Sequence, residues 1–317
     1  MPLLTPSLNE IYAPIQAGLK EFSKILQSQL DSEDELIRAI NQHLLKMSGK
    51  FLRPALTLFS FYMDGREQEN ARAIKLAAAI ELIHTATLVH DDIIDNSLLR
   101  RNQPSVYSKW GREISIISGD YIYAKAFLLL ASIKDAWVNE AFAACAQVIC
   151  EGEMKQVEMR KNFLMSENEY IRIIHQKTAA LFQAACMGGA HLAGNGKEKI
   201  EALGTFGFNL GLAFQIVDDC LDLTGDPDHL GKTTGLDIYK NDVTLPLLYL
   251  HQNGNGLKNK DPEEIRELCI KTGAVDKAMD KARKYGDQAI NQLEAFPPSP
   301  YKEGLTQLAQ HCLDRVR

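Results

Sequence analysis

Two clusters of aspartate lie inside otherwise apolar stretches, and they constrain the fold more than any other feature of the chain. The first cluster reads HDDIID, from His90 to Asp95, and the second reads VDDCLD, from Val217 to Asp222. An α-helix returns to the same face every three to four residues, so Asp91 and Asp95 project together. Carboxylates crowded on an apolar helix repel one another unless cations lie between them. The clusters therefore predict two helices on opposite walls of a site that holds several cations and, through them, a polyanion.

The remainder of the chain predicts an all-α, single-domain helical bundle over residues 1–317. Its 317 residues, 45% of them apolar, are enough for a substantial core. The clearest predicted helices cover residues 74–89, 121–133, 138–159 and 206–223. Alternating β-branched strands are scarce, and residues 114–117 form the one short candidate. Breaks rich in Gly and Pro are too short to require a linker between domains.

Composition excludes several classes of function. A net charge of −6 with no long basic block argues against nucleic acid as a partner. Six scattered cysteines, none in a CxxC pair, indicate neither a zinc site nor a disulfide framework, which favours a reducing cytoplasm. The N-terminal segment lacks the pattern of a signal peptide. Apolar runs are interrupted before about 18 residues, so we expect no membrane span.

The two acidic clusters match the ligand preference of Mg²⁺, which takes oxygen ligands, keeps several waters and commonly links carboxylates to phosphates. No His/Cys cluster suits zinc, and no loop has the spacing of an EF-hand. One DDxxD pattern alone is equally consistent with a solvated acidic turn. Two such patterns inside apolar sequence favour a metal site.

Basic residues accompany these acids. Arginine binds phosphate oxygens through a planar fork, and lysine acts as a compact point charge. Taken singly, each cation is consistent with a solvated surface charge, but together they predict sites for more than one diphosphate. The residues are Lys50, Arg53, Arg100, Arg101, Lys177 and Lys232.

Seven motifs, in order between Gly49 and Ile238, resemble those of trans-isoprenyl (polyprenyl) diphosphate synthases, and of their long-chain octaprenyl-type branch in particular. The motifs are GKFLRP, ELIHTATLVHDDIIDNSLLRR, SGDYIYAKAF, EGEMKQ, HQKTAALF, FQIVDDCLD and GKTTGLDI. The resemblance implies an all-helical fold around a deep central cavity, assembled as a homodimer. It also implies head-to-tail condensation of an allylic diphosphate with isopentenyl diphosphate, with Mg²⁺ as cofactor and three ions in the substrate complex.

The resemblance also assigns roles to individual residues. The implied metal ligands are Asp91, Asp95, Asp218 and Asp222, with Asp92 and Asp219 orienting waters or neighbouring bases. The implied site for isopentenyl diphosphate consists of Lys50, Arg53, His84 and Arg101. The implied site for the allylic diphosphate consists of Arg100, Lys177 and Lys232, while Thr178 and Gln215 lie near the reacting carbons. His84 lies seven residues before Asp91, hence on nearly the same helical face, although a lone histidine there is also consistent with a core residue.

Product length depends on the residues upstream of the first cluster. Ala86 and Thr87 occupy the positions where short-chain relatives often have a bulky aromatic, and no aromatic ring occurs between Leu76 and Asp91. This predicts an open tunnel and a product of roughly seven to ten isoprene units, since a helix turn of about 5.4 Å matches one unit. Phe59, Phe61 and Phe127 are candidates for its floor. The alternatives are alanines that simply allow close helix packing, and a farnesyl or geranylgeranyl product.

Two positions depart from the family pattern, the smaller departure being Asn102, where the family usually has Gly after the double arginine. The family usually has a Gly-Lys pair before Thr-Leu-Pro, whereas this chain has Asp242 in place of the lysine. Lys240, two residues earlier, is a candidate substitute if the loop bends. Two other functions compete with synthesis of a polyprenyl chain: a terpene cyclase, which needs no second diphosphate site, and a non-catalytic subunit, which would be expected to lose its aspartates. The long product also suggests peripheral contact with a membrane.

Overall fold

The computed structural model describes residues 6–65, 70–225, 235–252 and 260–314 of the chain. The elements in chain order are α1 (Leu8–Ile11), η1 (Ala13–Ile15), α2 (Gln16–Gln29), α3 (Glu35–Lys46), α4 (Leu52–Tyr62), α5 (Ala71–Ile94), β1 (Leu99–Arg100), β2 (Gln103–Pro104), α6 (Val106–Ser132), α7 (Ala136–Glu158), α8 (Glu167–Ile174), the π-helical turn η2 (His175–Ala179), α9 (Ala180–Leu192), α10 (Lys197–Thr224), α12 (Leu236–Lys240), α13 (Leu245–Gln252), α14 (Pro262–Lys271), α15 (Ala274–Gln292), η3 (Leu293–Ala295) and α16 (Pro300–Leu313).

The all-α prediction is confirmed, and the one short strand candidate is helical. Residues 114–117 lie within α6, whose first turn is capped by the Ser105 side chain accepting from the Ser108 backbone N–H. A long helix that packs against α5 outweighs the strand preference of a short β-branched run. Among the described residues, the sheet content is a single antiparallel pair, with Leu99 opposite Pro104.

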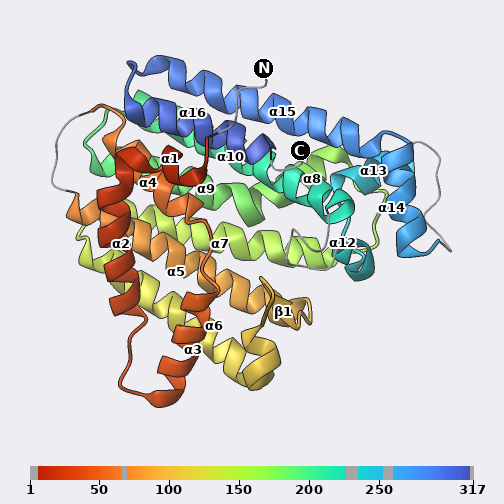
Figure 1. The fold of residues 1–317 in the computed structure, drawn as a ribbon, viewed down its shortest axis with the longest axis horizontal. Helices are drawn as coiled ribbons and strands as arrows, with labels where there is room; N and C mark the ends of the chain where they lie inside the picture. The colour runs from red at the N-terminus through yellow and green to blue at the C-terminus, as the bar shows by residue number, and fades with distance from the viewer. Residues whose placement is uncertain (1–5, 66–69, 226–234, 253–259, 315–317) are drawn as a thin grey trace.

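Helix α5 runs through the centre of the bundle, between α6, α4 and α2 (Figure 1). Every side chain from Leu76 to Ile83 is buried, whichever way it points. A helix that is apolar around its whole circumference is stable only inside a core. The position of α5 therefore follows from its sequence, and it carries the first aspartate cluster at its C-terminal end.

Helix α10 connects two parts of the core. Phe206 and Leu210 in its first half pack with the main cluster of α2, α4, α5 and α9. Ile216 and Val217 in its second half pack with a smaller cluster from α8, α13 and α15. The second aspartate cluster lies in this second half, so packing on both sides fixes the direction of its side chains.

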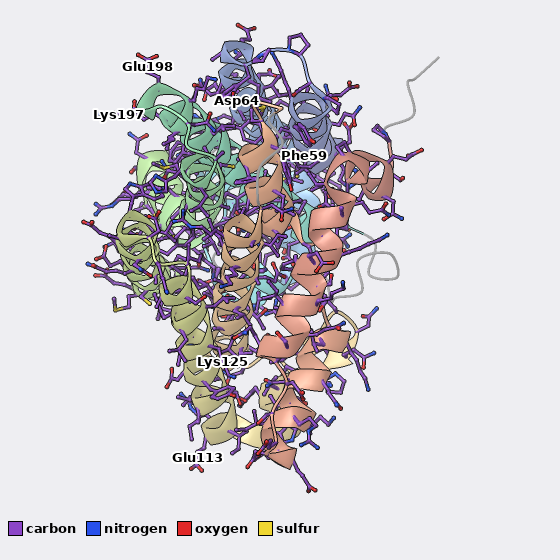
Figure 2. The ribbon with its side chains drawn as sticks, turned by 90° about the vertical axis from the view of Figure 1, so that its left-hand side faces the viewer. Phe59, Asp64, Glu113, Lys125, Lys197 and Glu198 are labelled. Carbon is purple, nitrogen blue, oxygen red and sulfur yellow. The ribbon has the colours of Figure 1, made fainter. Side chains whose placement is uncertain are left out.

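The start of α10 and the end of α4 meet at one end of the molecule, where Lys199 Nζ donates to Asp64 Oδ1 at 2.7 Å. Figure 2 shows Lys197 and Asp64 at this end and Glu113 of α6 at the opposite end. Both α5 and α10 carry their aspartates at their C-terminal ends.

Three helices, α5, α6 and α10, are long and apolar enough to cross a membrane by length and composition, contrary to the expectation of interrupted apolar runs. Within the fold, 67% of the apolar window of α5 and 61% of that of α10 are buried, whereas α6 buries only 33%. The apolar surface of α5 and α10 is thus largely used by packing inside the bundle.

Candidate active site

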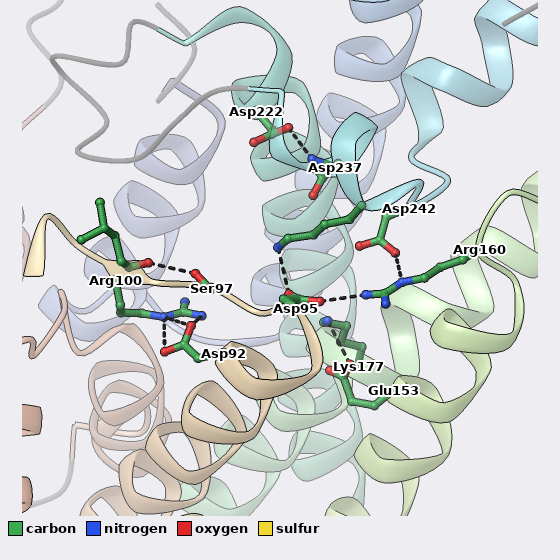
Figure 3. A network of polar contacts seen from close by, with 12 residues as sticks. Asp92, Asp95, Ser97, Arg100, Glu153, Arg160, Lys177, Asp222, Asp237 and Asp242 are labelled. Carbon is green, nitrogen blue, oxygen red and sulfur yellow. Dashed lines mark hydrogen bonds and ion pairs between the residues drawn. The ribbon is translucent and has the colours of Figure 1, made fainter. Parts of the chain in front are cut away.

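The two aspartate clusters converge at the C-terminal ends of α5 and α10. Asp95 is the C-cap of α5, and α10 ends two residues after Asp222, at Thr224. Helix C-termini carry the negative end of the helix dipole, so carboxylates there require compensating cations. Helix α12 joins the two ends: Lys240 Nζ lies 2.9 Å from Asp95 Oδ2, and the Asp237 backbone N–H donates to Asp222 Oδ2 at 3.1 Å (Figure 3).

Lys177 reaches this acidic site from the π-helical turn η2, a distortion frequent at functional sites. Helix α7 approaches the turn closely at Gly152, where an added Cβ would lie 2.7 Å from the Lys177 backbone nitrogen. The neighbouring Glu153 accepts from Lys177 Nζ at 3.0 Å. Burial lowers the pKa of Lys177, but the carboxylates of Asp91 and Glu153 outweigh this and hold that pKa above its usual value. Lys177 therefore stays charged.

A buried hydrogen-bonded chain braces the second cluster. Thr178 Oγ1 donates to Gln215 Oε1 at 2.7 Å, and Gln215 Nε2 donates to Asp219 Oδ1 at 2.8 Å. Tyr170 donates to the other oxygen of Asp219 at 2.6 Å. Burial raises the pKa of Asp219 to about 7, with Asp218 adding to the effect. Asp219 is therefore held by Gln215 and Tyr170. The adjacent Asp218 is only partly buried.

Arg100 is held by the middle aspartate of the first cluster. Its Nε and Nη2 donate to Asp92 Oδ1 at 3.0 and 2.6 Å. Asp92 itself is only 3% exposed. A fork of this kind fixes the guanidinium plane, which is the geometry that recognises phosphate oxygens.

These groups border a cavity of about 120 Å³. Its polar lining includes Asp95, Lys177, Gln215, Asp219 and Lys240. No group of three or more His, Cys, Asp or Glu side chains in the described residues is gathered closely enough to hold a metal ion. The carboxylates suit Mg²⁺, which completes its coordination with water and phosphate oxygens rather than with an all-protein cage.

A second cavity is lined by Asp92 and Arg100 together with Gly49, Glu81 and Arg101. It shares no described lining residue with the first. Leucines of α2 and α3 close its apolar side. The Arg101 guanidinium lies against Gly49 and donates to the Met47 carbonyl, so a side chain at position 49 would displace it.

Burial governs the charges around this second cavity. It lowers the pKa of Arg53, whose guanidinium lies 4.7 Å from the centroid of the Phe182 ring, to about 10. It raises the pKa of Glu81 to about 6 against the opposing pull of Arg53 and Arg101. It lowers the pKa of His84 well below its usual value, and the nearby arginines lower it further, so the imidazole is uncharged.

The structure gathers most of the predicted site residues, with some differences. Lys50 is exposed at the chain surface, and Lys232 lies outside the described residues. Ala86 is fully buried and Thr87 donates to the His84 carbonyl at 2.8 Å, yet neither lines either cavity. The tunnel therefore stays a prediction.

Among the aromatic residues predicted for its floor, Phe59 and Phe61 are buried. Phe127 is 36% exposed on α6, so it does not fit the floor of an enclosed tunnel.

Three residues at the site carry no assigned role in the sequence prediction: Glu153, Arg160 and Tyr170. Glu153 lies in the EGEMKQ motif, which could have pointed to its role in the site. Arg160 and Tyr170 lie in no motif that could have done so. Arg160 follows the end of α7 and contacts Asp242, a position that departs from the family pattern.

Comparison with known proteins agrees with this geometry. Residues 34–284 match the family model described as polyprenyl synthetase. The chain is 34% identical to the all-trans-nonaprenyl-diphosphate synthase (geranyl-diphosphate specific) of Rhodobacter capsulatus, over 97% of this chain and 98% of the relative. It is also 34% identical to the octaprenyl diphosphate synthase of Escherichia coli, over 98% of each.

Among solved structures, the polyprenyl synthase of Caulobacter crescentus, crystallised with calcium and isoprenyl diphosphate, superposes with a TM-score of 0.93 at 35% identity and 100% coverage of both chains. With a family match over most of the chain and relatives above 30% identity along nearly its whole length, this chain belongs to the polyprenyl synthetase family and is a prenyltransferase of the long-chain polyprenyl diphosphate synthase type.

Proposed function

We propose that the chain condenses isopentenyl diphosphate head to tail with an allylic diphosphate, farnesyl or geranylgeranyl diphosphate, in a Mg²⁺-dependent reaction. The observation that carries this proposal is the pair of separate cavities, one lined by aspartates with Lys177 and the other by Arg100 and Arg101. Two cavities, each lined by cations and by one aspartate of the first cluster, Asp95 in one and Asp92 in the other, suit two diphosphates. A terpene cyclase would have no use for the second.

The residues that would hold three Mg²⁺ ions with the allylic diphosphate are Asp91 and Asp95 on one wall and Asp218 and Asp222 on the other. When bound, the metal stabilises the negative charge that develops on the departing diphosphate. The arrangement of the carboxylates at two helix C-termini fits this role, because that environment favours cations.

The side chains of the protein divide the remaining work. Lys177 and Lys232 bind the allylic diphosphate, together with Arg100, which lines the second cavity and reaches the allylic diphosphate from there. Lys177 keeps its charge because Asp91 and Glu153 raise its pKa. Thr178 and Gln215 lie beside the reacting carbons, fixed by their mutual hydrogen bond. The cationic donors, held in place before the reaction, stabilise the negative charge that develops on the departing diphosphate without having to reorganise.

Isopentenyl diphosphate occupies the second cavity, where Arg101 of the lining binds its phosphates. The further ligands proposed for it, which do not themselves line that cavity, are Lys50, Arg53 and the uncharged imidazole of His84. The apolar walls exclude water, which would otherwise capture the allylic cation. The released diphosphate accepts the proton that leaves the new bond.

The product proposed is an all-trans chain of roughly seven to ten units, suited to a quinone side chain, with Ala86 and Thr87 lining the tunnel. The protein would act in the cytoplasm as a homodimer, with peripheral membrane contact during product release. The partly covered face of α6 supports association, because Ile117 and Leu128 are 63% and 68% exposed there.

The decisive experiment incubates the purified protein with radiolabelled isopentenyl diphosphate and farnesyl diphosphate, with and without Mg²⁺, and separates the products by chromatography. We expect incorporation only with Mg²⁺, into chains of roughly seven to ten units. No incorporation would favour a non-catalytic subunit, and a dominant product of three or four units would identify a short-chain synthase. Sedimentation of the same preparation tests the homodimer.

A further inference from the structure

Asp242 brings a negative charge to a site that must bind an anion. It occupies the position where the family usually has lysine, so the local charge changes from +1 to −1. Its side chain is only 7% exposed and lines the same cavity as Asp95 and Lys177. Without compensation, a buried carboxylate here would repel a diphosphate.

Two cations offset this change, and both contact Asp95. Arg160 Nη2 donates to Asp95 Oδ1 at 2.8 Å, while its Nε donates to Asp242 Oδ1 at 2.8 Å (Figure 3). Lys240 Nζ donates to Asp95 Oδ2 at 2.9 Å. The four side chains thus form a balanced cluster of two carboxylates and two cations, contributed by the ends of α5, α7 and α12.

The backbone fixes Arg160 relative to Asp242. The Lys161 N–H donates to the Asn241 carbonyl at 3.0 Å, which ties the residues after α7 to those after α12. Asn241 adopts the left-handed conformation, with φ of 61°, that turns the chain at this point. The guanidinium is therefore held by a side-chain contact and by a main-chain contact one residue away, and it is 24% exposed, so its remaining N–H groups are not sealed off.

We propose that Arg160, positioned by Asp242, binds the allylic diphosphate beside Lys240 and so replaces the lysine that the family usually has at position 242. An arginine has five N–H donors, and the two contacts above leave donors for phosphate oxygens. Asp95 holds the Arg160 and Lys240 cations at the cavity, so both are next to a diphosphate that Mg²⁺ would link to the first aspartate cluster. The assignment rests on the proposed prenyl transfer.

The test uses four variants and two readouts. The variants are Arg160→Met, Arg160→Met with Asp242→Asn, Arg160→Met with Asp242→Lys, and Lys155→Met as the matched control. Lys155 lies in the last turn of α7, five residues before Arg160, and it pairs with Glu158 rather than with the cluster. The readouts are calorimetric binding of the non-reactive analogue farnesyl thiodiphosphate with Mg²⁺, and KM for each substrate in prenyl transfer.

We expect Arg160→Met to weaken analogue binding and raise KM for the allylic diphosphate about 10- to 100-fold, the range for a lost charge-assisted hydrogen bond, with KM for isopentenyl diphosphate unchanged. Adding Asp242→Asn should not restore binding, because the charge is balanced but the donors are missing. Adding Asp242→Lys should restore it, because the lysine then supplies the contact directly. The Lys155→Met control should bind as the unaltered protein does.

Normal binding in Arg160→Met would overturn the assignment. So would recovery with Asp242→Asn, since Arg160 would then only neutralise Asp242, and so would a lack of recovery with Asp242→Lys in a variant of unchanged melting temperature. The proposed function fails in a different way: the unaltered protein would bind the analogue without transferring a prenyl group, and the calorimetric comparison would still decide the role of Arg160.

Discussion

Replacing Ala86 by tyrosine tests whether a tunnel runs along α5. Ala86 lies five residues before Asp91, which is about 7.5 Å along the helix axis. A ring at that depth would stop an isoprenoid chain roughly one to two units beyond the aspartates, if about 5.4 Å of helix corresponds to one unit. We therefore expect Ala86→Tyr to convert a long-chain product into a short one.

A tyrosine placed deeper on the same face of α5 should stop the product at a greater length. Ala79 lies seven residues before Ala86, on nearly the same side of α5 and about 10.5 Å further along it. Ala79→Tyr should therefore give a product longer by about two units than Ala86→Tyr does. Both alanines are fully buried, so each substitution is expected to cost about 1–3 kcal/mol of stability through overpacking.

The assay is chromatography of the dephosphorylated products, with the melting temperature of each variant measured alongside. Ala86→Ser, which adds little volume, is the matched control and should leave the product unchanged. If folded Ala86→Tyr makes the same product as the unaltered protein, or if both tyrosine variants stop at one length, the alanines serve helix packing and do not line a tunnel.

Three further predictions concern stability. Gly207→Ala should lower the free energy of unfolding by about 1–3 kcal/mol, because the new Cβ would lie 2.6 Å from the Phe182 carbonyl oxygen, whereas at Gly196 nothing lies within 4 Å; equal urea midpoints for Gly207→Ala and Gly196→Ala would contradict this. The folded-state pKa of Glu81, about 6 against an ordinary 4.5, means that the folded protein holds this proton more tightly than the unfolded chain does. The stability that the protonated Glu81 side chain contributes is fully present below about pH 4.5 and is lost as pH rises through about 6. Glu81→Gln should therefore remove about 2 kcal/mol from the change in the free energy of unfolding between those pH values, measured by urea unfolding. Parallel curves of unfolding free energy against pH for the two proteins would refute this. Burial raises the pKa values of Glu153 and Asp219 to about 7, so ionised carboxylates accumulate in the metal-free site as pH rises. Mg²⁺ should therefore raise the melting temperature more at about pH 8 than at about pH 5.5, and an equal shift at both would argue against a metal site here.

The helices were predictable because their sequences leave few alternatives. The stretch from Leu76 to Ile83 is apolar almost throughout and contains neither Gly nor Pro, so it can satisfy its backbone only as a buried helix. Residues 114–117 are a strand candidate by local preference alone, because four residues cannot report the long-range packing that places them in α6. Local preference decides an element when the segment is long, and tertiary contacts decide it when the segment is short.

The pairing of aspartates within each cluster was predictable for the same reason, since helical spacing fixes which of them share a face. The residues that contact the carboxylates of the site were not predictable in this way. Tyr170 is 49 positions from Asp219, and Lys177 is 24 positions from Glu153, so no local spacing relates them. The π-helical turn that carries Lys177 and Thr178 also shifts the register of these side chains, which a regular helical pattern does not reveal.

Asp242 shows how a sequence can locate such a partner without identifying it. A carboxylate at a usually basic position, in a site that binds anions, must either abolish binding or be neutralised by a cation that the motif does not contain. The metal-ligand aspartates remain in place, which argues against lost function, so a compensating cation is required. The sequence offers only Lys240 as a neighbour, whereas Arg160, 82 positions away, is the residue that contacts Asp242. A reversed charge in an otherwise intact motif therefore points to a contact elsewhere in the fold, and only the structure identifies the residue that makes it.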